Sequence, residues 1–135
     1  MSWLYTIKVP FPPSVNTLYR NNAGCGKRPK SKRYEEWCKE ARPFALADKP
    51  ETISVPMVAW YRHGQPDLKR RRDVENYSKA VSDLLKEEKI IEDDSLIHCS
   101  IAEWADDVPE GYTEVILASS SVLGVQVADA FKNML

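Results

Sequence analysis

Four carboxylates and a lysine in the middle of the chain have the residue types of a metal-dependent site that cleaves phosphoesters. Asp73 and Glu75 follow a run of basic residues, and Lys79 comes one helical turn later. Asp93 and Asp94 follow at the far end of a predicted helix. Carboxylate oxygens are ligands that Mg²⁺ prefers, and a lysine ammonium can hold a phosphate oxygen as a point charge. The two groups of acids form one site if the fold brings them together.

Each of these residues also has an ordinary structural explanation. Glu75, Lys79 and Asp83 fit a solvated helix face with surface ion pairs, each worth about 0.3–0.5 kcal/mol. Asp73 alone is typical of a helix N-cap, and Asp93 with Asp94 is typical of a turn. Residue type and spacing leave both explanations open, because convergence of the acids is an assumption at this point.

The segment between the two groups of acids is predicted to be a helix that starts near Asp73. Aspartate is a favoured N-cap because its carboxylate accepts hydrogen bonds from the first backbone N–H groups. Glu75 and Lys79 are four residues apart, as are Lys79 and Asp83, so each pair lies on one side of the helix. Apolar residues at helical spacing form the other face: Val74, Tyr77, Val81, Leu84 and Leu85.

Charge is unevenly distributed along the chain, although the formal net charge is only −1. Five of the seven residues from Lys27 to Arg33 are basic, and the run from Lys69 to Arg72 is wholly basic. Clustered cations are typical of phosphate binding, and they are equally typical of a solubilising loop when no site lies nearby. The second run directly precedes Asp73, so at least one of its arginines can hold a phosphate beside the site.

Four strands and one more helix are expected around the central helix. Alternating apolar residues predict strands at residues 2–9 and 53–62, and Ser31 would cap a helix over residues 32–47. Pro56 restricts the second strand to a sheet edge or a bulge, because proline has no N–H for the ladder. Residues 96–104 and 113–119 are predicted to pair antiparallel as a hairpin across a turn-rich connection.

The resulting order, strand, helix, strand, helix, strand, strand, predicts an α+β fold. Such a fold would be a two-layer structure, with a four-stranded mixed sheet and helices on one face. Apolar residues three apart near the C-terminus add a helical extension over residues 120–135, which Gly124 weakens.

Length and composition are typical of a single globular domain over residues 1–135. Hydrophobic residues make up 43% and charged residues 29% of the chain, which argues against a disordered or membrane protein. The N-terminus alternates like a strand and lacks the features of a signal peptide, so we expect a cytoplasmic protein without a membrane partner. Three cysteines without a close pair and two histidines argue against a disulfide framework or a zinc site. Oxygen ligands are the remaining option for a metal.

With these motifs in hand, the chain resembles the RusA family of Holliday-junction resolvases, which are small phage-associated and bacterial endonucleases. The segment PPSVNTLYR is similar to the family's Pro-Pro-Ser-x-Asn-x-x-Tyr segment after its first strand. The segments RRRDVENYSKAVSDLL and IIEDDSLI resemble the family's Arg-Arg-x-Asp-x-Asp-Asn, its lysine and its Asp-Asp at the same spacings. The resemblance covers residues 5–118, and the joint spacing carries it rather than any one motif.

The resemblance implies metal ligands at Asp73, Glu75 and Asp94, with Asp93 as a further candidate and Lys79 as the catalytic lysine. Glu75 departs from the family's usual aspartate and keeps the carboxylate on a stem one carbon longer. The family also implies Mg²⁺ as cofactor, with Mn²⁺ as the alternative ion, a homodimer, and paired incisions across four-way DNA junctions in recombination and repair. Basic residues beside such a site would bind DNA: Lys27, Arg28, Lys30, Lys32, Arg33, Lys69, Arg70, Arg71 and Arg72.

Two other functions stay open at the level of the sequence. The first is a non-cutting protein of the same fold that binds branched DNA, which the Glu75 departure suggests. The second is an interaction protein whose acid-rich surface and C-terminal helix mediate assembly, without a role for nucleic acid.

Overall fold

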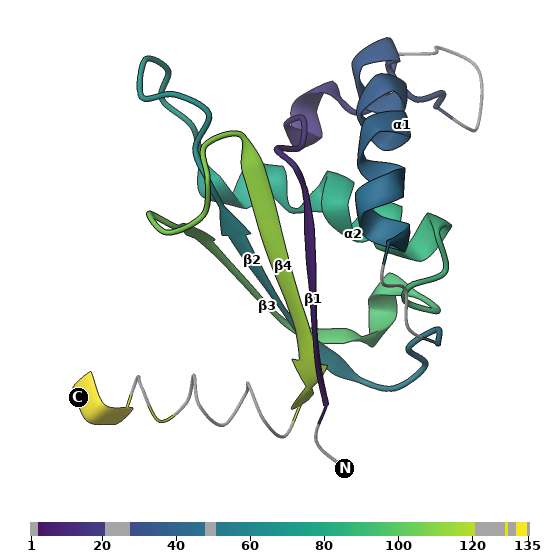
Figure 1. Cartoon of the computed structure of the whole chain (residues 1–135), viewed down its shortest axis with the longest axis vertical. Coiled ribbons are helices and arrows are strands. Elements are labelled where there is room, and N and C mark those ends of the chain that lie inside the picture. The colour runs from purple at the N-terminus through teal and green to yellow at the C-terminus, as the bar shows by residue number, and fades with distance from the viewer. Residues whose placement is uncertain (1–2, 21–27, 48–50, 121–128, 130–131, 135) are drawn as a thin grey trace.

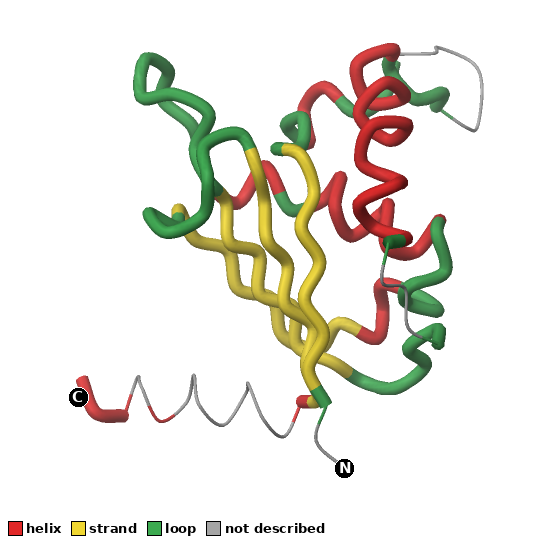
Figure 2. Tube along the Cα trace, in the orientation of Figure 1, coloured by secondary structure: helices red, strands yellow, loops and turns green. Residues whose placement is uncertain are grey.

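A four-stranded sheet forms one layer of the molecule, and helices cover one of its faces (Figures 1 and 2). The computed structural model describes residues 3–20, 28–47, 51–120, 129 and 132–134. This architecture confirms the predicted α+β class with a mixed sheet. The elements are β1 (Leu4–Pro10), η1 (Val15–Thr17), α1 (Lys32–Leu46), β2 (Met57–His63), η2 (Val74–Tyr77), α2 (Lys79–Glu87), η3 (Asp94–Leu96), β3 (Ile97–Trp104) and β4 (Tyr112–Ser119).

The strand order is β1-β4-β2-β3. Strand β4 pairs antiparallel with both β1 and β2, and β2 pairs parallel with β3. The prediction that residues 96–104 and 113–119 form a hairpin is therefore wrong, because β2 lies between β3 and β4. Their connection bonds instead to the end of β2: the N–H of Ala105 donates to the carbonyl of His63, and that of Gly111 donates to the carbonyl of Gly64.

Pro56 lies just before β2 and determines where this strand starts. The strand is in the interior of the sheet, so the expected edge position is wrong. The register between β2 and β3 shifts between Met57 and Val58, which agrees with the alternative expectation of a bulge. Because Pro56 has no N–H to donate, regular pairing on both sides of β2 begins only after it.

The core lies between the sheet and the helices, and it orients α2. Val81, Leu84 and Leu85 of the predicted apolar stripe are fully buried, and each such side chain stabilises the fold by about 1.5–3 kcal/mol. The polar side of α2 consequently faces solvent. Further core residues come from both layers: Ile7, Val9, Tyr34, Trp37, Ala41, Met57, Ala59 and Leu117.

The predicted helix from Asp73 is divided into two shorter elements. A 3-10 turn, η2, comes first, and α2 starts only at Lys79. Asp73 is the N-cap of η2, since its carboxylate accepts a hydrogen bond from the N–H of Glu75 at 3.2 Å. Of the two predicted pairs, Lys79 and Asp83 form an ion pair, whereas Glu75 lies before the start of α2.

Only part of the predicted C-terminal extension belongs to the described residues. Residues 129 and 132–134 of the predicted C-terminal extension are helical, and most of the rest lies outside the described residues. In the described part of the chain, no helix has the length and apolar character needed to cross a membrane.

Candidate functional site

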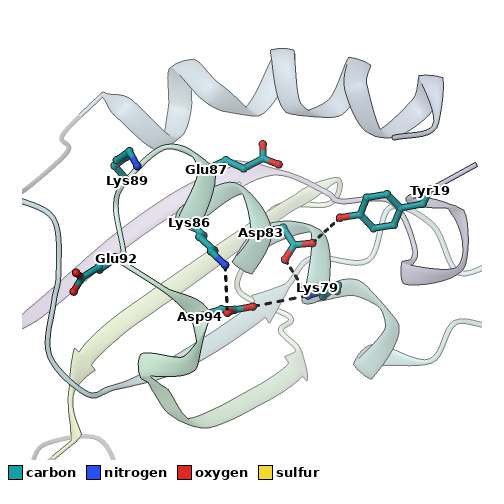
Figure 3. A pocket seen from close by; sticks show the side chains of 8 residues that line it. All are labelled: Tyr19, Lys79, Asp83, Lys86, Glu87, Lys89, Glu92 and Asp94. Atoms are coloured by element: carbon teal, nitrogen blue, oxygen red, sulfur yellow. Dashed lines mark hydrogen bonds and ion pairs between the residues drawn. The ribbon is translucent and has the colours of Figure 1, made fainter. Parts of the chain in front are cut away.

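An open cavity of about 440 Å³ lies along the polar side of α2 (Figure 3). It joins segments that are far apart in the sequence, because Tyr19 follows η1 and Asp94 begins the turn before β3. Of the residues predicted to converge, Lys79 and Asp94 line this cavity together, whereas Asp73, Glu75 and Asp93 are not among its lining residues. The residues that line the cavity are Tyr19, Lys79, Asp83, Lys86, Glu87, Lys89, Glu92 and Asp94.

Lys79 stands between two carboxylates at the first turn of α2. Its Nζ lies 3.0 Å from Oδ1 of Asp83 and 3.9 Å from Oδ2 of Asp94 (Figure 3). The hydrogen bond to Asp83 raises the pKa of the Lys79 ammonium above its usual value, and the charge of Asp94 adds to this effect. Lys79 is therefore a fully charged ammonium at neutral pH, held at the edge of an open cavity.

Tyr19 and Asp83 line the cavity but lie outside the predicted set of catalytic and metal-binding residues. The hydroxyl of Tyr19 donates a hydrogen bond to Oδ2 of Asp83 at 3.2 Å, while Oδ1 of the same carboxylate contacts Lys79. Burial, and next the charge of Asp83, raise the pKa of Tyr19, so its phenol keeps the proton that it donates. The signal in the sequence was the position of Tyr19 within the PPSVNTLYR motif, whereas Asp83 had no signal beyond its spacing from Lys79.

Lys86 forms a close ion pair with only one of the two adjacent acids, Asp93. Its Nζ lies 2.8 Å from Oδ1 of Asp93 and 4.0 Å from Oδ1 of Asp94. Asp93 also caps η3 by accepting a hydrogen bond from the N–H of Ser95 at 3.0 Å. These hydrogen bonds, the one from Lys86 first, hold the pKa of Asp93 well below its usual range. Asp93 is thus engaged on both oxygens, whereas Asp94 faces the cavity with 39% of its side chain exposed.

Asp73, just before η2, and Glu75, within it, are exposed and do not line this cavity. One oxygen of Asp73 caps η2, as described above. Within the described ranges, no three side chains of the His, Cys, Asp or Glu type are close enough together to hold a metal ion. The ligand set of Asp73, Glu75 and Asp94 stays a prediction.

The first basic run lies beside the cavity. Lys30 forms an ion pair with Glu87, a cavity residue, at 2.8 Å. Arg28 donates hydrogen bonds to the backbone carbonyls of Tyr19 and Arg20. Lys27 lies outside the described residues. Two members of the run are exposed on the first turn of α1: Lys32 and Arg33.

The second basic run divides into an exposed part and a nearly buried part. Lys69, Arg70 and Arg71 are exposed. The side chain of Arg72 is only 7% exposed, and its Nη2 lies 3.2 Å from Oδ2 of Asp67. Arg72 is therefore engaged within the protein, unlike the three residues before it.

A model of one protein family matches most of the chain. The family is described as Endodeoxyribonuclease RusA, and the match spans residues 10–116. This range contains every described residue of the cavity and both basic runs. Comparison with curated proteins finds no match. Since the family match covers well over half of the sequence and includes the motifs that form the site, the chain belongs to the RusA endodeoxyribonuclease family.

Proposed function

We propose that this protein is a Mg²⁺-dependent, structure-selective endodeoxyribonuclease that resolves Holliday junctions by paired phosphodiester hydrolysis in DNA recombination and repair. Family membership supports the nuclease activity and a branched DNA substrate. The observation that carries the proposal is the position of the Lys79 ammonium, between Asp83 at 3.0 Å and Asp94 at 3.9 Å, on an open cavity. A fixed ammonium with an accessible carboxylate beside it suits a phosphate that arrives from solvent.

The donor chemistry of the site is compatible with a divalent metal. Asp94 is exposed to the cavity, and its ammonium neighbours lie 3.9 and 4.0 Å away rather than in close ion pairs, which leaves its oxygens accessible. Asp94, Asp73 and Glu75 are the proposed ligands and offer oxygen atoms alone, as Mg²⁺ prefers and Mn²⁺ accepts, although the three side chains are not clustered in the described structure. When bound, the ion supplies charge stabilisation for the phosphate and lowers the pKa of a water molecule.

Lys79 is the catalytic lysine in this proposal. Negative charge builds up on the nonbridging oxygens of the phosphate during hydrolysis, and the Lys79 ammonium donates hydrogen bonds to one of them. A donor that is already in place needs no reorganisation when the charge develops, which is the main source of electrostatic catalysis. Asp83 is a positioning residue, because its carboxylate holds Lys79 in place, and Tyr19 in turn donates a hydrogen bond to that carboxylate.

The proposed substrate is a four-way DNA junction, bound by a homodimer. Lys30 pairs with Glu87 at the cavity, and Lys32 and Arg33 are exposed on the first turn of α1. Contacts between such cations and phosphates supply much of the affinity for DNA. A four-way junction has two-fold symmetry, so a two-fold dimer would present one site to each of two opposed strands.

Cleavage of a labelled synthetic four-way junction tests the proposal. We expect the wild-type protein with Mg²⁺ to make paired, symmetric cuts. Asp94→Asn and Asp73→Asn should bind the junction and leave it intact. Glu92→Gln is the matched control, because Glu92 lines the same cavity and is no part of the proposed ligand set. Binding without cuts by the wild-type protein at any Mg²⁺ or Mn²⁺ concentration would reject the proposed activity.

A non-cutting junction-binding protein is the second candidate. It is favoured by the position of Lys86, whose ammonium already compensates Asp93 at 2.8 Å, and by the longer side chain of Glu75. This function predicts junction binding with little affinity for Mg²⁺. Calorimetric titration would count against it if Mg²⁺ bound tightly to the wild-type protein and not to Asp73→Asn. Glu75→Asp is the change expected to restore cleavage to such a protein.

A further inference from the structure

The loop from Asp67 to Arg72 is closed by contacts between its two end residues. Nη1 of Arg72 donates a hydrogen bond to the backbone carbonyl of Asp67 at 3.0 Å, and Nη2 lies 3.2 Å from Oδ2 of the same residue. The N–H of Lys69 donates to Oδ1 of Asp67 at 3.0 Å. These hydrogen bonds, that of Arg72 first, lower the pKa of Asp67. The carboxylate therefore stays charged, and the pair acts as a brace across the loop.

The base of this loop is fixed to the end of the sheet. The N–H of Gly64 donates to the carbonyl of Tyr112 at 2.8 Å, and the N–H of Gly111 donates to the carbonyl of Gly64 at 3.1 Å. The backbone approach is so close that a Cβ on Gly64 would lie 2.2 Å from the carbonyl oxygen of Pro109. The loop leaves β2 from this tight point and projects beyond the sheet, away from α1 (Figure 1).

The braced loop exposes one apolar and three basic side chains to solvent. Leu68 is 88% exposed, and Lys69, Arg70 and Arg71 follow it, all exposed. A single exposed leucine is ordinary on a protein surface. Here, however, it belongs to a braced loop, next to Asp67, and is followed directly by three cations, which would bring DNA phosphates to it. In proteins that bend DNA, apolar side chains such as leucine insert between base steps and unstack them.

We infer that the braced loop is a DNA-binding prong whose Leu68 inserts at the branch point of a DNA junction. Unstacking a base step costs least where stacking is already interrupted, as it is at a branch. Arg72 directly precedes Asp73, so the brace also fixes the prong relative to the proposed site. The inference rests on the proposed DNA substrate and assigns to Leu68 a selectivity for branched over linear DNA.

Fluorescence of 2-aminopurine at the branch nucleotides of a four-way junction tests this inference. Measurements in EDTA keep the DNA intact, so that the readout is independent of catalysis. Binding of the wild-type protein should raise the fluorescence, because the base becomes unstacked. Leu68→Met should keep the rise, whereas Leu68→Ser should lose most of it and lower the preference for junction over duplex by about 10-fold.

A matched control is Val55→Ser, which replaces an apolar residue that is 49% exposed before β2, at the other end of this strand. This variant should behave as the wild-type protein does. Equal fluorescence for Leu68→Ser and wild type, or no rise with either, would overturn the inference even if the protein cuts junctions. Conversely, a Leu68-dependent rise in a protein that does not cut with Mg²⁺ would reject the proposed nuclease and keep the prong.

Discussion

Oδ1 of Asp83 lies 3.0 Å from the Nζ of Lys79, one turn along α2. The order of the two charges is the less stabilising one, because the cation stands at the N-terminal end of the helix and the acid follows it. A cation in the first turn also opposes the helix dipole, at a cost of about 0.3–1 kcal/mol. A pair that only stabilised α2 would have the opposite order. The arrangement is instead suited to holding an ammonium at the cavity.

We therefore expect function and stability to respond in opposite directions when Lys79 is replaced. Lys79→Met should slow junction cleavage about 100-fold or more, because it removes a preorganised donor. Its free energy of unfolding should be unchanged or slightly higher, because the unfavourable dipole interaction is lost. Single-turnover cleavage and urea unfolding measure the two effects. Lys89→Met is the control, since Lys89 lines the same cavity. A Lys79→Met protein that cleaves at the wild-type rate would contradict the assigned role.

Asp83→Asn tests the positioning of Lys79 separately. The amide keeps the size of the side chain and removes the charge that raises the pKa of Lys79. We expect cleavage to fall about 10-fold with junction binding retained, and the pKa of Lys79, followed by NMR of its Nζ, to fall toward its ordinary value. A purely structural Asp83 would change unfolding and leave both the cleavage rate and this pKa unmoved.

Lys86 should compete with a divalent ion for the adjacent acids. Its Nζ lies 2.8 Å from Asp93 and 4.0 Å from Asp94. At 4 Å, one unit charge is worth about 1 kcal/mol in water, which corresponds to about a fivefold change in affinity. Lys86→Met should therefore bind Mg²⁺ about fivefold more tightly by calorimetry. An unchanged or weaker affinity would show that the ammonium does not compete.

The helices and strands of this fold could be predicted from the sequence, whereas the pairing of the strands could be predicted only in part. Ser31 caps α1 as expected, because capping is a local interaction: its Oγ accepts from the N–H of Tyr34 at 3.2 Å. The predicted hairpin of residues 96–104 and 113–119 is wrong. Turn-rich residues indicate that the chain reverses direction, but they do not indicate which strand it pairs with afterwards. The connection bonds to His63 and Gly64 of the β2 end, far away in the sequence.

Long-range contacts also explain why the helix from Asp73 is divided. The helical spacing of apolar residues continues past Ser78. In the structure, however, Ser78 separates η2, which ends at Tyr77, from α2, which starts at Lys79. The Oγ of Ser78 makes no cap and lies 3.3 Å from Nε2 of the buried His63, a contact that periodicity does not encode. Similarly, Tyr19 reaches Asp83 across 64 positions of the chain. Its part in the site could be inferred from a family motif and from no local pattern.

The slope of DNA affinity against salt concentration should separate the exposed arginines of the second basic run from the braced one. Each phosphate contact that is lost lowers the slope of log K against log salt by about 0.9. Arg70→Met and Arg71→Met should each lower it by about this amount, whereas Arg72→Met should leave it unchanged because Arg72 already pairs with Asp67. Filter-binding titrations between low and moderate salt measure the slope. A drop for Arg72→Met equal to that for Arg70→Met would assign Arg72 to the DNA instead.

His63 should make the stability of the fold depend on pH. It is fully buried, with Nδ1 2.8 Å from the hydroxyl of Thr113, and burial lowers its pKa to about 4. The unfolded chain, with an ordinary histidine pKa of about 6.5, takes up the proton first as the pH falls. The contribution of His63 is therefore complete above pH 6.5 and is lost progressively as the pH falls toward 4.

Between pH 7 and pH 5, this linkage should cost the wild-type protein about 2 kcal/mol of its free energy of unfolding. His63→Gln should be less stable at pH 7, because buried contacts are lost, and should lack this part of the pH dependence. The other histidine provides the control: His98 is exposed, so His98→Gln should keep the wild-type dependence. Urea unfolding at the two pH values measures all three proteins. If His63→Gln lost as much stability as the wild type over this interval, carboxylates rather than His63 would account for the sensitivity to acid.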